Sequence, residues 1–128
     1  MSGGARILLA DDDEVLQELV RRALEREGYV VVPALTAAAV MAEIAKEKPD
    51  LIVLDVGLPD GDGRDLLATL KKSSRTRSIP VLIWSGRDAE SDRRIALDLG
   101  AEDYVEKGST ADLVRQIERL LLRLRMQA

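Results

Sequence analysis

The chain has 128 residues, of which 46% are hydrophobic and 33% charged, and its formal net charge is −4. This length predicts one domain with a single core, and the composition is that of a globular protein without the roughly 20 consecutive apolar residues of a membrane span. The chain contains neither cysteine nor histidine, which excludes disulfides, thiolate zinc sites and Ser-His-Asp or Cys-His catalysis.

Short β-branched or leucine-rich runs alternate five times with amphipathic stretches, which is typical of a parallel sheet built from βα units. Strands are predicted at residues 6–10, 30–33, 51–55, 81–85 and 103–106. Helices are predicted at about residues 14–27, 37–47, 64–73, 88–99 and 110–125. The predicted fold class is therefore α/β, a doubly wound five-stranded parallel sheet with five helices. Residues 6–125 are expected to form one domain, after a disordered or tag-like N-terminus at residues 1–5.

Glycine, proline and capping residues mark the ends of these elements. Gly28 and Gly100 are placed to end the first and fourth helices. Ser109 precedes the last helix, with Asp112 three residues on, as in a capping box. Pro33 cannot donate a hydrogen bond within a sheet, so the second strand is expected at a sheet edge. The fifth strand is short and charged, which suits the other edge.

Polar residues follow the predicted strands at the points where a ligand is expected. In an open parallel α/β sheet, ligands bind outside the carboxyl ends of the strands. The residues at these ends are Asp11, Asp12, Asp13, Asp55, Ser85 and Lys107. Several carboxylates, one hydroxyl and one ammonium are therefore expected to meet at one edge of the sheet.

An acidic cluster of this kind favours a bound cation. Carboxylates about 4 Å apart repel each other by roughly 4 kcal/mol at an effective dielectric of about 20. Because only oxygen ligands are on offer, Mg²⁺ is the metal that fits best. Mg²⁺ beside a carboxylate and a lysine suggests phosphoryl transfer, in which both cations neutralise phosphoryl oxygens while the carboxylate attacks in line.

Four segments carry a family resemblance: ILLADDD, LIVLDVGLPDGDG, VLIWSG and GAEDYVEKG. Together they resemble the receiver domain of two-component response regulators, over residues 6–119. The separations are 43 residues from Asp12 to Asp55, 30 from Asp55 to Ser85 and 22 from Ser85 to Lys107. Each is at or next to the spacing usual in that family. The resemblance implies a flavodoxin-like sheet with strand order 2-1-3-4-5.

The resemblance also implies how phosphorylation would proceed. Asp55 would be the phosphoacceptor, Lys107 would contact the phosphoryl group as its counter-charge, and the Ser85 hydroxyl would receive a phosphoryl oxygen. Tyr104 would be the aromatic switch residue whose inward or outward rotamer follows Ser85. The buried third strand then serves as a rigid mount for Asp55, and the glycine-rich loop lets backbone approach metal and phosphate closely.

The same resemblance implies the metal ligands. Asp12, Asp55 and the backbone carbonyl of Gly57 would bind Mg²⁺ directly, and Asp11 would bind it through a water molecule. The plainer interpretation of the neighbouring Asp13 is an N-cap of the first helix, since Asp before an apolar periodic run is an ordinary helix start.

The chain departs from the family pattern after the lysine. Receivers usually have a proline there, often with a cis peptide bond, whereas this chain has Gly108. Because a cis bond that does not involve proline costs about 3 to 4 kcal/mol, a trans bond between Lys107 and Gly108, or a distorted loop, is expected. Two further positions resemble those that tune the lifetime of the phosphate in the family. They are occupied here by Gly57 and by Arg87, which lies two residues beyond Ser85.

The function implied by the resemblance is a phosphorylation-dependent signalling switch and not an enzyme. The phosphoryl donor would be a phosphohistidine of a histidine kinase or phosphotransfer protein, which must act in trans because this chain has no histidine. Output would leave through the fourth helix, fifth strand and fifth helix, toward a second copy or a downstream domain. The mildly acidic charge argues against direct nucleic-acid binding. No membrane contact is expected, and the lack of a secretory signal indicates a cytoplasmic location.

Two other functions stay open at this stage. One is a pseudo-receiver, a binding module that works without phosphorylation. The other is a phosphatase of the haloacid dehalogenase type, which also places a nucleophilic Asp after a buried strand. That class needs a second Asp two residues on, where this chain has Gly57.

The last helix carries a second apolar strip. Leu122 lies opposite Leu113 on a helical wheel, with Met126 near it. We expect this end of the helix to meet a partner, a second copy or a downstream segment, and the plainer alternative is a frayed terminus.

Overall fold

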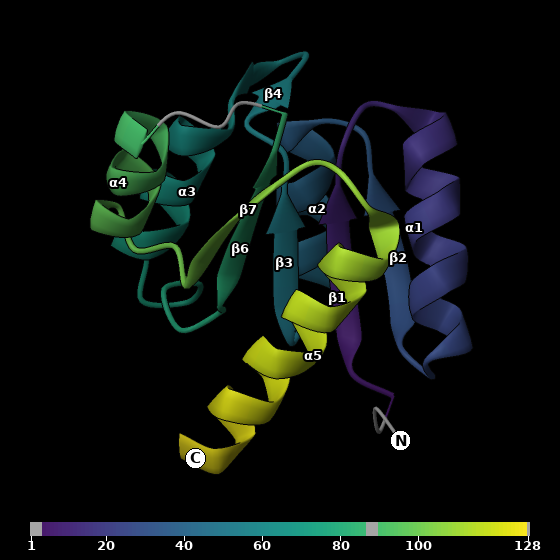
Figure 1. Ribbon diagram of the computed structural model, residues 1–128. Helices are drawn as coiled ribbons and strands as arrows, with labels where there is room; N and C mark the ends of the chain where they lie inside the picture. The colour runs from purple at the N-terminus through teal and green to yellow at the C-terminus, as the bar shows by residue number, and fades with distance from the viewer. Residues whose placement is uncertain (1–3, 87–89, 128) are drawn as a thin grey trace.

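The computed structural model describes residues 4–86 and 90–127, which form alternating strands and helices (Figure 1). The strands are β1 (Arg6–Ala10), β2 (Val30–Ala34), β3 (Leu51–Leu54), β4 (Gly57–Leu58), β5 (Gly61–Asp62), β6 (Val81–Ser85) and β7 (Asp103–Glu106). The helices are α1 (Glu14–Arg26), α2 (Ala37–Lys46), α3 (Gly63–Lys72), α4 (Glu90–Asp98) and α5 (Thr110–Gln127).

These bounds differ from the sequence expectation by a few residues at most. The second strand runs one residue further, to Ala34, and the third ends at Leu54, so that Asp55 is the first residue beyond it. The third helix begins and ends one residue earlier than expected, and the last helix continues to Gln127. The expected start of the fourth helix, at residues 88 and 89, lies outside the described residues.

Five strands form one parallel sheet in the order β2-β1-β3-β6-β7. Counted by their place in the chain, these strands follow the order 2-1-3-4-5, which confirms the fold class. β2, which contains Pro33, and β7 are the two edge strands, as expected. The remaining pair, β4 and β5, is a two-residue antiparallel hairpin that was not predicted.

Helices cover the sheet on both faces, and each face has its own core (Figure 1). Buried residues of α1 and α5, including Leu24 and Ile117, pack with Leu9 and Trp84 of the sheet. The opposite core joins α2, α3 and α4 to the sheet. β3 lies between two strands and its four residues are 0% exposed, which explains why it reads as an unbroken apolar run.

Side-chain caps and glycines set the helix ends. The Asp13 carboxylate accepts a hydrogen bond from the Leu16 N–H at 3.1 Å, so Asp13 is the N-cap of α1. The Ser109 hydroxyl accepts from the Asp112 N–H at 3.4 Å at the start of α5. Gly28 and Gly100, which follow α1 and α4, have φ values of 92° and 108°, a conformation that favours glycine.

The hairpin is tied to a helix by one carboxylate. Asp60, in the turn between β4 and β5, accepts hydrogen bonds from the N–H groups of Ala37 at 2.7 Å and Ala38 at 3.0 Å. These are among the donors that the first turn of α2 leaves unpaired within the helix. The loop that follows Asp55 is therefore anchored to α2.

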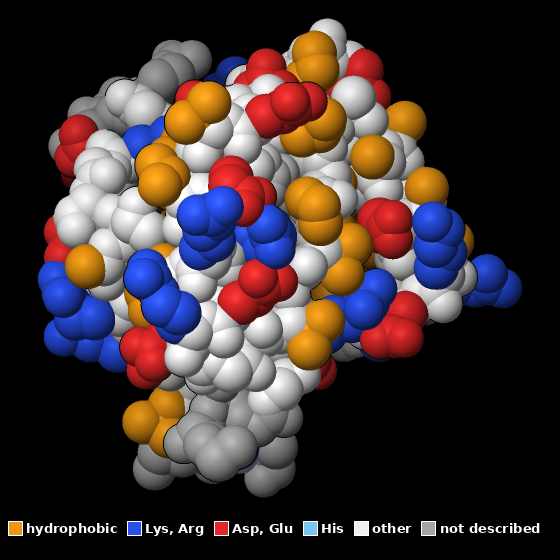
Figure 2. Space-filling model, turned by 90° about the vertical axis from the view of Figure 1, so that its right-hand side faces the viewer, with side chains coloured by type: hydrophobic (Ala, Val, Ile, Leu, Met, Phe, Trp, Pro, Cys, Tyr) orange, Lys and Arg blue, Asp and Glu red, His pale blue; other side chains and the backbone are white. Residues whose placement is uncertain are grey.

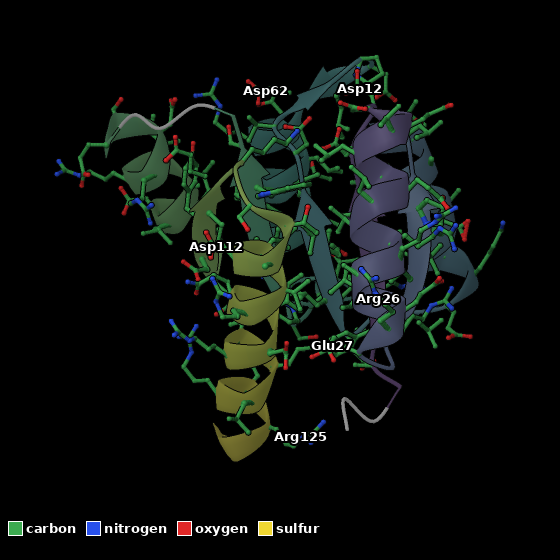
Figure 3. All side chains as sticks on the ribbon, turned by 45° about the vertical axis from the view of Figure 1, so that its right-hand side comes forward. Asp12, Arg26, Glu27, Asp62, Asp112 and Arg125 are labelled. Atoms are coloured by element: carbon green, nitrogen blue, oxygen red, sulfur yellow. The ribbon has the colours of Figure 1, made fainter. Side chains whose placement is uncertain are left out.

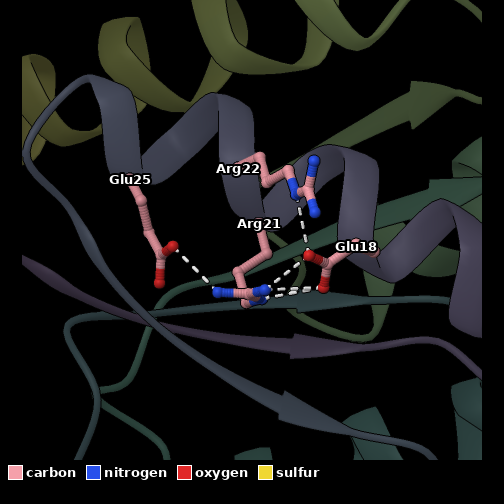
Figure 4. A network of polar contacts seen from close by, with 4 residues as sticks. All are labelled: Glu18, Arg21, Arg22 and Glu25. Carbon is pink, nitrogen blue, oxygen red and sulfur yellow. Dashed lines mark hydrogen bonds and ion pairs between the residues drawn. The ribbon is translucent and has the colours of Figure 1, made fainter.

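The face that carries α1 is polar and bears charges of both signs, with apolar side chains between them (Figure 2). Arg21 contacts Glu18 at 2.6 Å and Glu25 at 2.9 Å, and Arg22 contacts Glu18 at 2.8 Å (Figure 4). These hydrogen bonds from Arg21 and Arg22 lower the pKa of Glu18 below its usual value. Solvent screens exposed helix pairs of this kind, so they contribute little to stability.

The last helix extends past the rest of the molecule at the end opposite the hairpin (Figure 1). Leu121 and Leu124 pack against the core, whereas Leu122 is 58% exposed. The second apolar strip expected from the sequence is thus exposed at Leu122, while the side chain of Met126 lies outside the described residues. Among the described helices, none combines the length and the apolarity that crossing a bilayer requires.

Candidate functional site

Three carboxylates meet where the central strands end. Asp11 and Asp12 follow β1, and Asp55 follows the neighbouring strand β3. Each offers an oxygen within 4.8 Å of the others. Figure 3 places Asp12 and Asp62 at this end of the molecule, and Glu27 and Arg125 at the opposite end. The juxtaposition expected from the sequence is therefore present.

Lys107 reaches this cluster from the segment between β7 and α5. Its Nζ lies 2.7 Å from Asp11 Oδ2 and 3.4 Å from Asp55 Oδ2. Burial lowers the pKa of Lys107, but the contacts with Asp11 and Asp55 outweigh this and raise it overall. The side chain consequently stays an ammonium and offsets part of the negative charge.

The two buried carboxylates differ in their surroundings. Asp11 is 1% exposed and accepts a hydrogen bond from the Asp13 N–H at 2.9 Å. Asp55 is 8% exposed and accepts from the Gly57 N–H at 3.3 Å. Burial raises the pKa of Asp55 against the opposing effect of Lys107, and the charge of Asp11 adds to the rise. The ionised form of Asp55 is thus held in an unfavourable environment, as is common at functional sites.

The residues present fit a hard divalent cation. The cluster offers only oxygen ligands, and its net charge remains negative with one lysine beside three carboxylates. Asp12 is exposed, so a cation can approach the cluster from solvent. Gly57 has room beside it, since a Cβ there would lie 3.9 Å from Asp55 Oδ2.

Ser85 and Tyr104 lie on the strands next to the cluster. β6 pairs with β3, with Ile83 opposite Leu54, so Ser85 and Asp55 leave the sheet at the same edge. Ser85 is 1% exposed, and its carbonyl accepts a hydrogen bond from the Lys107 N–H at 2.6 Å. Tyr104 on β7 is 2% exposed and therefore points inward, with the Arg93 guanidinium 5.2 Å from its ring centre.

The segment after Lys107 has Gly108 where the family usually has a proline. No peptide bond within residues 4–86 and 90–127 is cis, so the expected trans bond before Gly108 is confirmed. Gly108 is exposed, and a Cβ added there would meet no atom of residues 4–86 and 90–127 within 4 Å, apart from its chain neighbours. Arg87 lies outside the described residues.

Two residues at the site were missed in the sequence. Gln17 on α1 is 5% exposed, and its Nε2 lies within hydrogen-bond distance of the carbonyls of Leu9, Asp11 and Ala34, at 2.8, 3.0 and 3.1 Å. It therefore joins the ends of β1 and β2 beneath the acidic loop. The sequence did contain a signal for this role, because Gln17 is a polar residue on the face of α1 that also carries the buried Val20. The second is Trp84, whose ring lies 5.2 Å from Lys107 Nζ.

The carboxylates and the ammonium gathered at the carboxyl edge of this doubly wound α/β sheet form the arrangement that the resemblance to receiver domains implied. Residues 7–118 match the family of response regulator receiver domains, so the chain belongs to that family. This membership and the acidic pocket of Asp11, Asp12 and Asp55 support the role of a phosphoryl-accepting switch in two-component signal transduction. Membership of the receiver family also separates the chain from the haloacid dehalogenase alternative.

Curated relatives are longer than this chain. KDP operon transcriptional regulatory protein KdpE of Escherichia coli (strain K12) is 43% identical over 101 residues, which are 79% of this chain and 44% of that protein. Phosphate regulon transcriptional regulatory protein PhoB of the same organism is 37% identical over 120 residues, 93% of this chain and 52% of that protein. The chain thus spans about half the length of the curated relatives it matches.

Solved structures match nearly the whole chain. The CheY-like response regulator receiver domain protein from Methanospirillum hungatei JF-1 has a TM-score of 0.88 at 30% identity, covering 97% of this chain and 98% of that one. The BeF3-activated N-terminal receiver domain of Klebsiella pneumoniae RstA has a TM-score of 0.83 at 29% identity, covering 92% and 98%.

Proposed function

We propose that residues 6–125 form a receiver domain in which Asp55 accepts a phosphoryl group from a phosphohistidine of a partner protein. The observation that carries this proposal is the position of Asp55. It directly follows the fully buried β3, within 4.8 Å of two other carboxylates and 3.4 Å from the Lys107 ammonium. A nucleophile held this rigidly next to fixed charges is suited to phosphoryl transfer, where positioning and electrostatics supply most of the catalysis.

The transfer is a displacement at phosphorus. An Asp55 carboxylate oxygen forms a bond to phosphorus while the bond between phosphorus and the donor histidine nitrogen breaks, and the electron pair of that bond stays with the imidazole. Lys107 contacts a phosphoryl oxygen and offsets its charge, and the Ser85 hydroxyl donates a hydrogen bond to another. The product is an acyl phosphate on Asp55.

Mg²⁺ is the cation proposed for the acidic cluster, with Asp12, Asp55 and the Gly57 carbonyl as direct ligands and Asp11 acting through water. When bound, it supplies positive charge that neutralises the phosphoryl oxygens. The all-oxygen ligand set and the exposure of Asp12 support this assignment. Asp12→Ala should abolish Mg²⁺ binding and leave the fold intact, because the side chain is on the surface.

The conformational readout is proposed to run through Ser85 and Tyr104. A phosphoryl oxygen that engages the Ser85 hydroxyl draws this residue toward Asp55 and changes the space available to Tyr104. The rotamer of the Tyr104 ring, which is inward in this structure, would follow Ser85, and its contact with Arg93 would change with it. Such a switch shifts a population between two states by the difference in their affinities for the phosphoryl group.

The partners follow from this chemistry. The donor is a histidine kinase or a histidine phosphotransfer protein, and output leaves through α4, β7 and α5 toward a second copy or a downstream domain. The KdpE and PhoB relatives are named as transcriptional regulatory proteins, which supports a downstream domain as recipient. The domain acts as a switch and not as an enzyme with turnover, in the cytoplasm, without binding nucleic acid or membrane itself.

The experiment that tests the proposal is a beryllofluoride titration with Mg²⁺, followed by the emission of Trp84, the only tryptophan in the chain. Trp84 precedes Ser85 and contacts Lys107, so an acyl phosphate mimic on Asp55 should change its emission. Asp55→Asn is the control and should give no response. An unchanged emission in wild type would favour a pseudo-receiver, the binding module that works without phosphorylation.

A further inference from the structure

Outside the acidic cluster, Lys107 contacts Ser85 through its backbone and the ring of Trp84 through its ammonium. Its N–H donates to the Ser85 carbonyl at 2.6 Å, which fixes the backbone. The next residue, Gly108, is exposed, and within the described part of the chain, its two chain neighbours aside, no heavy atom lies within 4 Å of where its Cβ would be. Packing of the following residue therefore contributes little to the direction of the lysine side chain.

The ring of Trp84 packs beside the Lys107 side chain. The Lys107 Nζ lies 5.2 Å from the centre of this ring, within the range of a cation–π interaction. Trp84 is 1% exposed and packs in the core formed with α1 and α5, so the ring is held in place. Its Nε1 has no hydrogen-bond partner among the described residues. The ring thus acts on Lys107 through its face and its bulk, not through the indole N–H.

We propose that Trp84 is a positioning residue that holds the Lys107 ammonium over the acidic cluster, and this inference rests on the proposed function. In the present state Lys107 lies closer to Asp11 than to Asp55. To contact a phosphoryl group on Asp55, the ammonium must move away from Asp11. The face of the Trp84 ring attracts the ammonium without a hydrogen bond of fixed direction. The ammonium can therefore move and stay in contact with the ring. A leucine at position 84 would fill part of the space but offers no negative ring face.

A direct test of the contact is a chemical-shift measurement. The ring current of Trp84 should displace the Lys107 ε-methylene protons upfield in the NMR spectrum of the wild-type protein. Trp84→Leu should return them to the position of a solvated lysine, and Trp84→Phe should retain part of the displacement. Equal shifts in all three proteins would overturn the inference.

The functional test compares beryllofluoride affinity in the presence of saturating Mg²⁺, measured by ¹⁹F NMR because the variants lack tryptophan. Trp84→Leu should weaken binding by about five- to tenfold, and Trp84→Phe should stay within about twofold of wild type. Affinity for Mg²⁺ alone should be unchanged in both variants, because Lys107 is not a proposed metal ligand. A purely structural role would lower both affinities together.

The matched control is Leu82→Val, on the same strand and in the same core two residues away. It should lower the melting temperature but not the beryllofluoride affinity. In a Lys107→Ala background, Trp84→Leu should have no further effect on that affinity, as expected for two coupled residues.

The outcomes separate the two proposals. If wild type takes up no beryllofluoride, the proposed function fails and the positioning role fails with it. If wild type binds but Trp84→Leu binds equally well, or if the two substitutions are additive, only the positioning role fails.

Discussion

The ammonium of Lys107 lies nearer to Asp11 than to Asp55, with Nζ to Oδ2 distances of 2.7 and 3.4 Å. Asp11 is also the more deeply buried of the two carboxylates. Lys107 therefore acts first as the counter-ion of the buried Asp11. In the absence of metal and phosphate, this ion pair stabilises the acidic cluster.

Removal of Lys107 should consequently destabilise the metal-free protein. Lys107→Ala leaves Asp11 and Asp55 without their cation, and the loss of one partner from a buried ion pair costs about 3 to 5 kcal/mol. Urea unfolding in EDTA should show this loss, and Mg²⁺ should restore part of it. Lys72→Ala, a change at an exposed lysine of α3, is the control. Equal stability of the two variants would contradict the counter-ion role.

Asp55→Asn should stabilise the metal-free protein. The pKa of Asp55 is raised by burial, so the folded state disfavours its ionised form at neutral pH. An amide of the same shape removes this penalty and can still accept the Gly57 hydrogen bond. The free energy of unfolding in EDTA should rise by about 0.5 to 2 kcal/mol, as for other trade-offs between stability and function. Mg²⁺ should then stabilise wild type more than the variant.

The difference in free energy of unfolding between Asp55→Asn and wild type should depend on pH. Because the folded pKa of Asp55 lies above its ordinary value of 3.8, the folded state binds more protons than the unfolded state between these two values. Stability contributed by this group therefore falls as pH rises through that window. The advantage of Asp55→Asn over wild type should be full at neutral pH and shrink as pH drops toward 4. A gap of constant size would show that the carboxyl charge is not its cause.

The proximity of the candidate site residues could be predicted because the position of each follows from the sheet. The end of a buried parallel strand can be recognised from its apolar run, and all such ends meet at one edge. Asp12, Asp55 and Lys107 could therefore be brought together without coordinates. Family resemblance then supplied a role for each.

Contacts between individual side chains could not be predicted from the ends of the strands. Periodicity groups Val15 and Leu19 with the apolar residues of α1, yet they are 74% and 55% exposed, while Gln17 is buried and bonds to strand carbonyls. The contact of Trp84 with Lys107 depends on how a strand and a distant loop meet in space. The β4–β5 hairpin was missed because two-residue strands leave no periodic pattern.

Asp60 is expected to stabilise α2 from outside the helix. Its pKa is lowered by the hydrogen bonds from the N–H groups of Ala37 and Ala38. Asp60→Ala should lower the melting temperature by a few degrees, and Asp60→Asn, which keeps an acceptor oxygen, by less. Because the folded pKa lies below 3.8, the contribution of the carboxylate is present above that pH and is lost as pH falls through the folded value. Wild type and Asp60→Asn should therefore converge in strong acid, and a difference that persists there would contradict this origin.

Gly63 is the glycine that the phosphoacceptor loop can least replace. A Cβ at Gly63 would lie 2.5 Å from Val56 Cα and 2.7 Å from the Asp55 carbonyl oxygen, both of them backbone atoms. The Gly63 N–H also donates to the Val56 carbonyl at 2.8 Å, so the two segments cannot separate without losing this bond. Gly63→Ala must therefore displace the backbone that carries Asp55.

The expected loss of stability for Gly63→Ala is about 1 to 3 kcal/mol, the range for overpacking a buried site. Beryllofluoride affinity in the folded fraction should fall on the order of tenfold, because the backbone under the nucleophile has moved. Gly61→Ala is the matched control two residues away, where a Cβ would meet nothing within 4 Å. It should change stability by no more than about 0.5 kcal/mol and leave the affinity unaltered. If both variants behave alike in urea unfolding and in the titration, close backbone approach is not the reason for glycine at position 63.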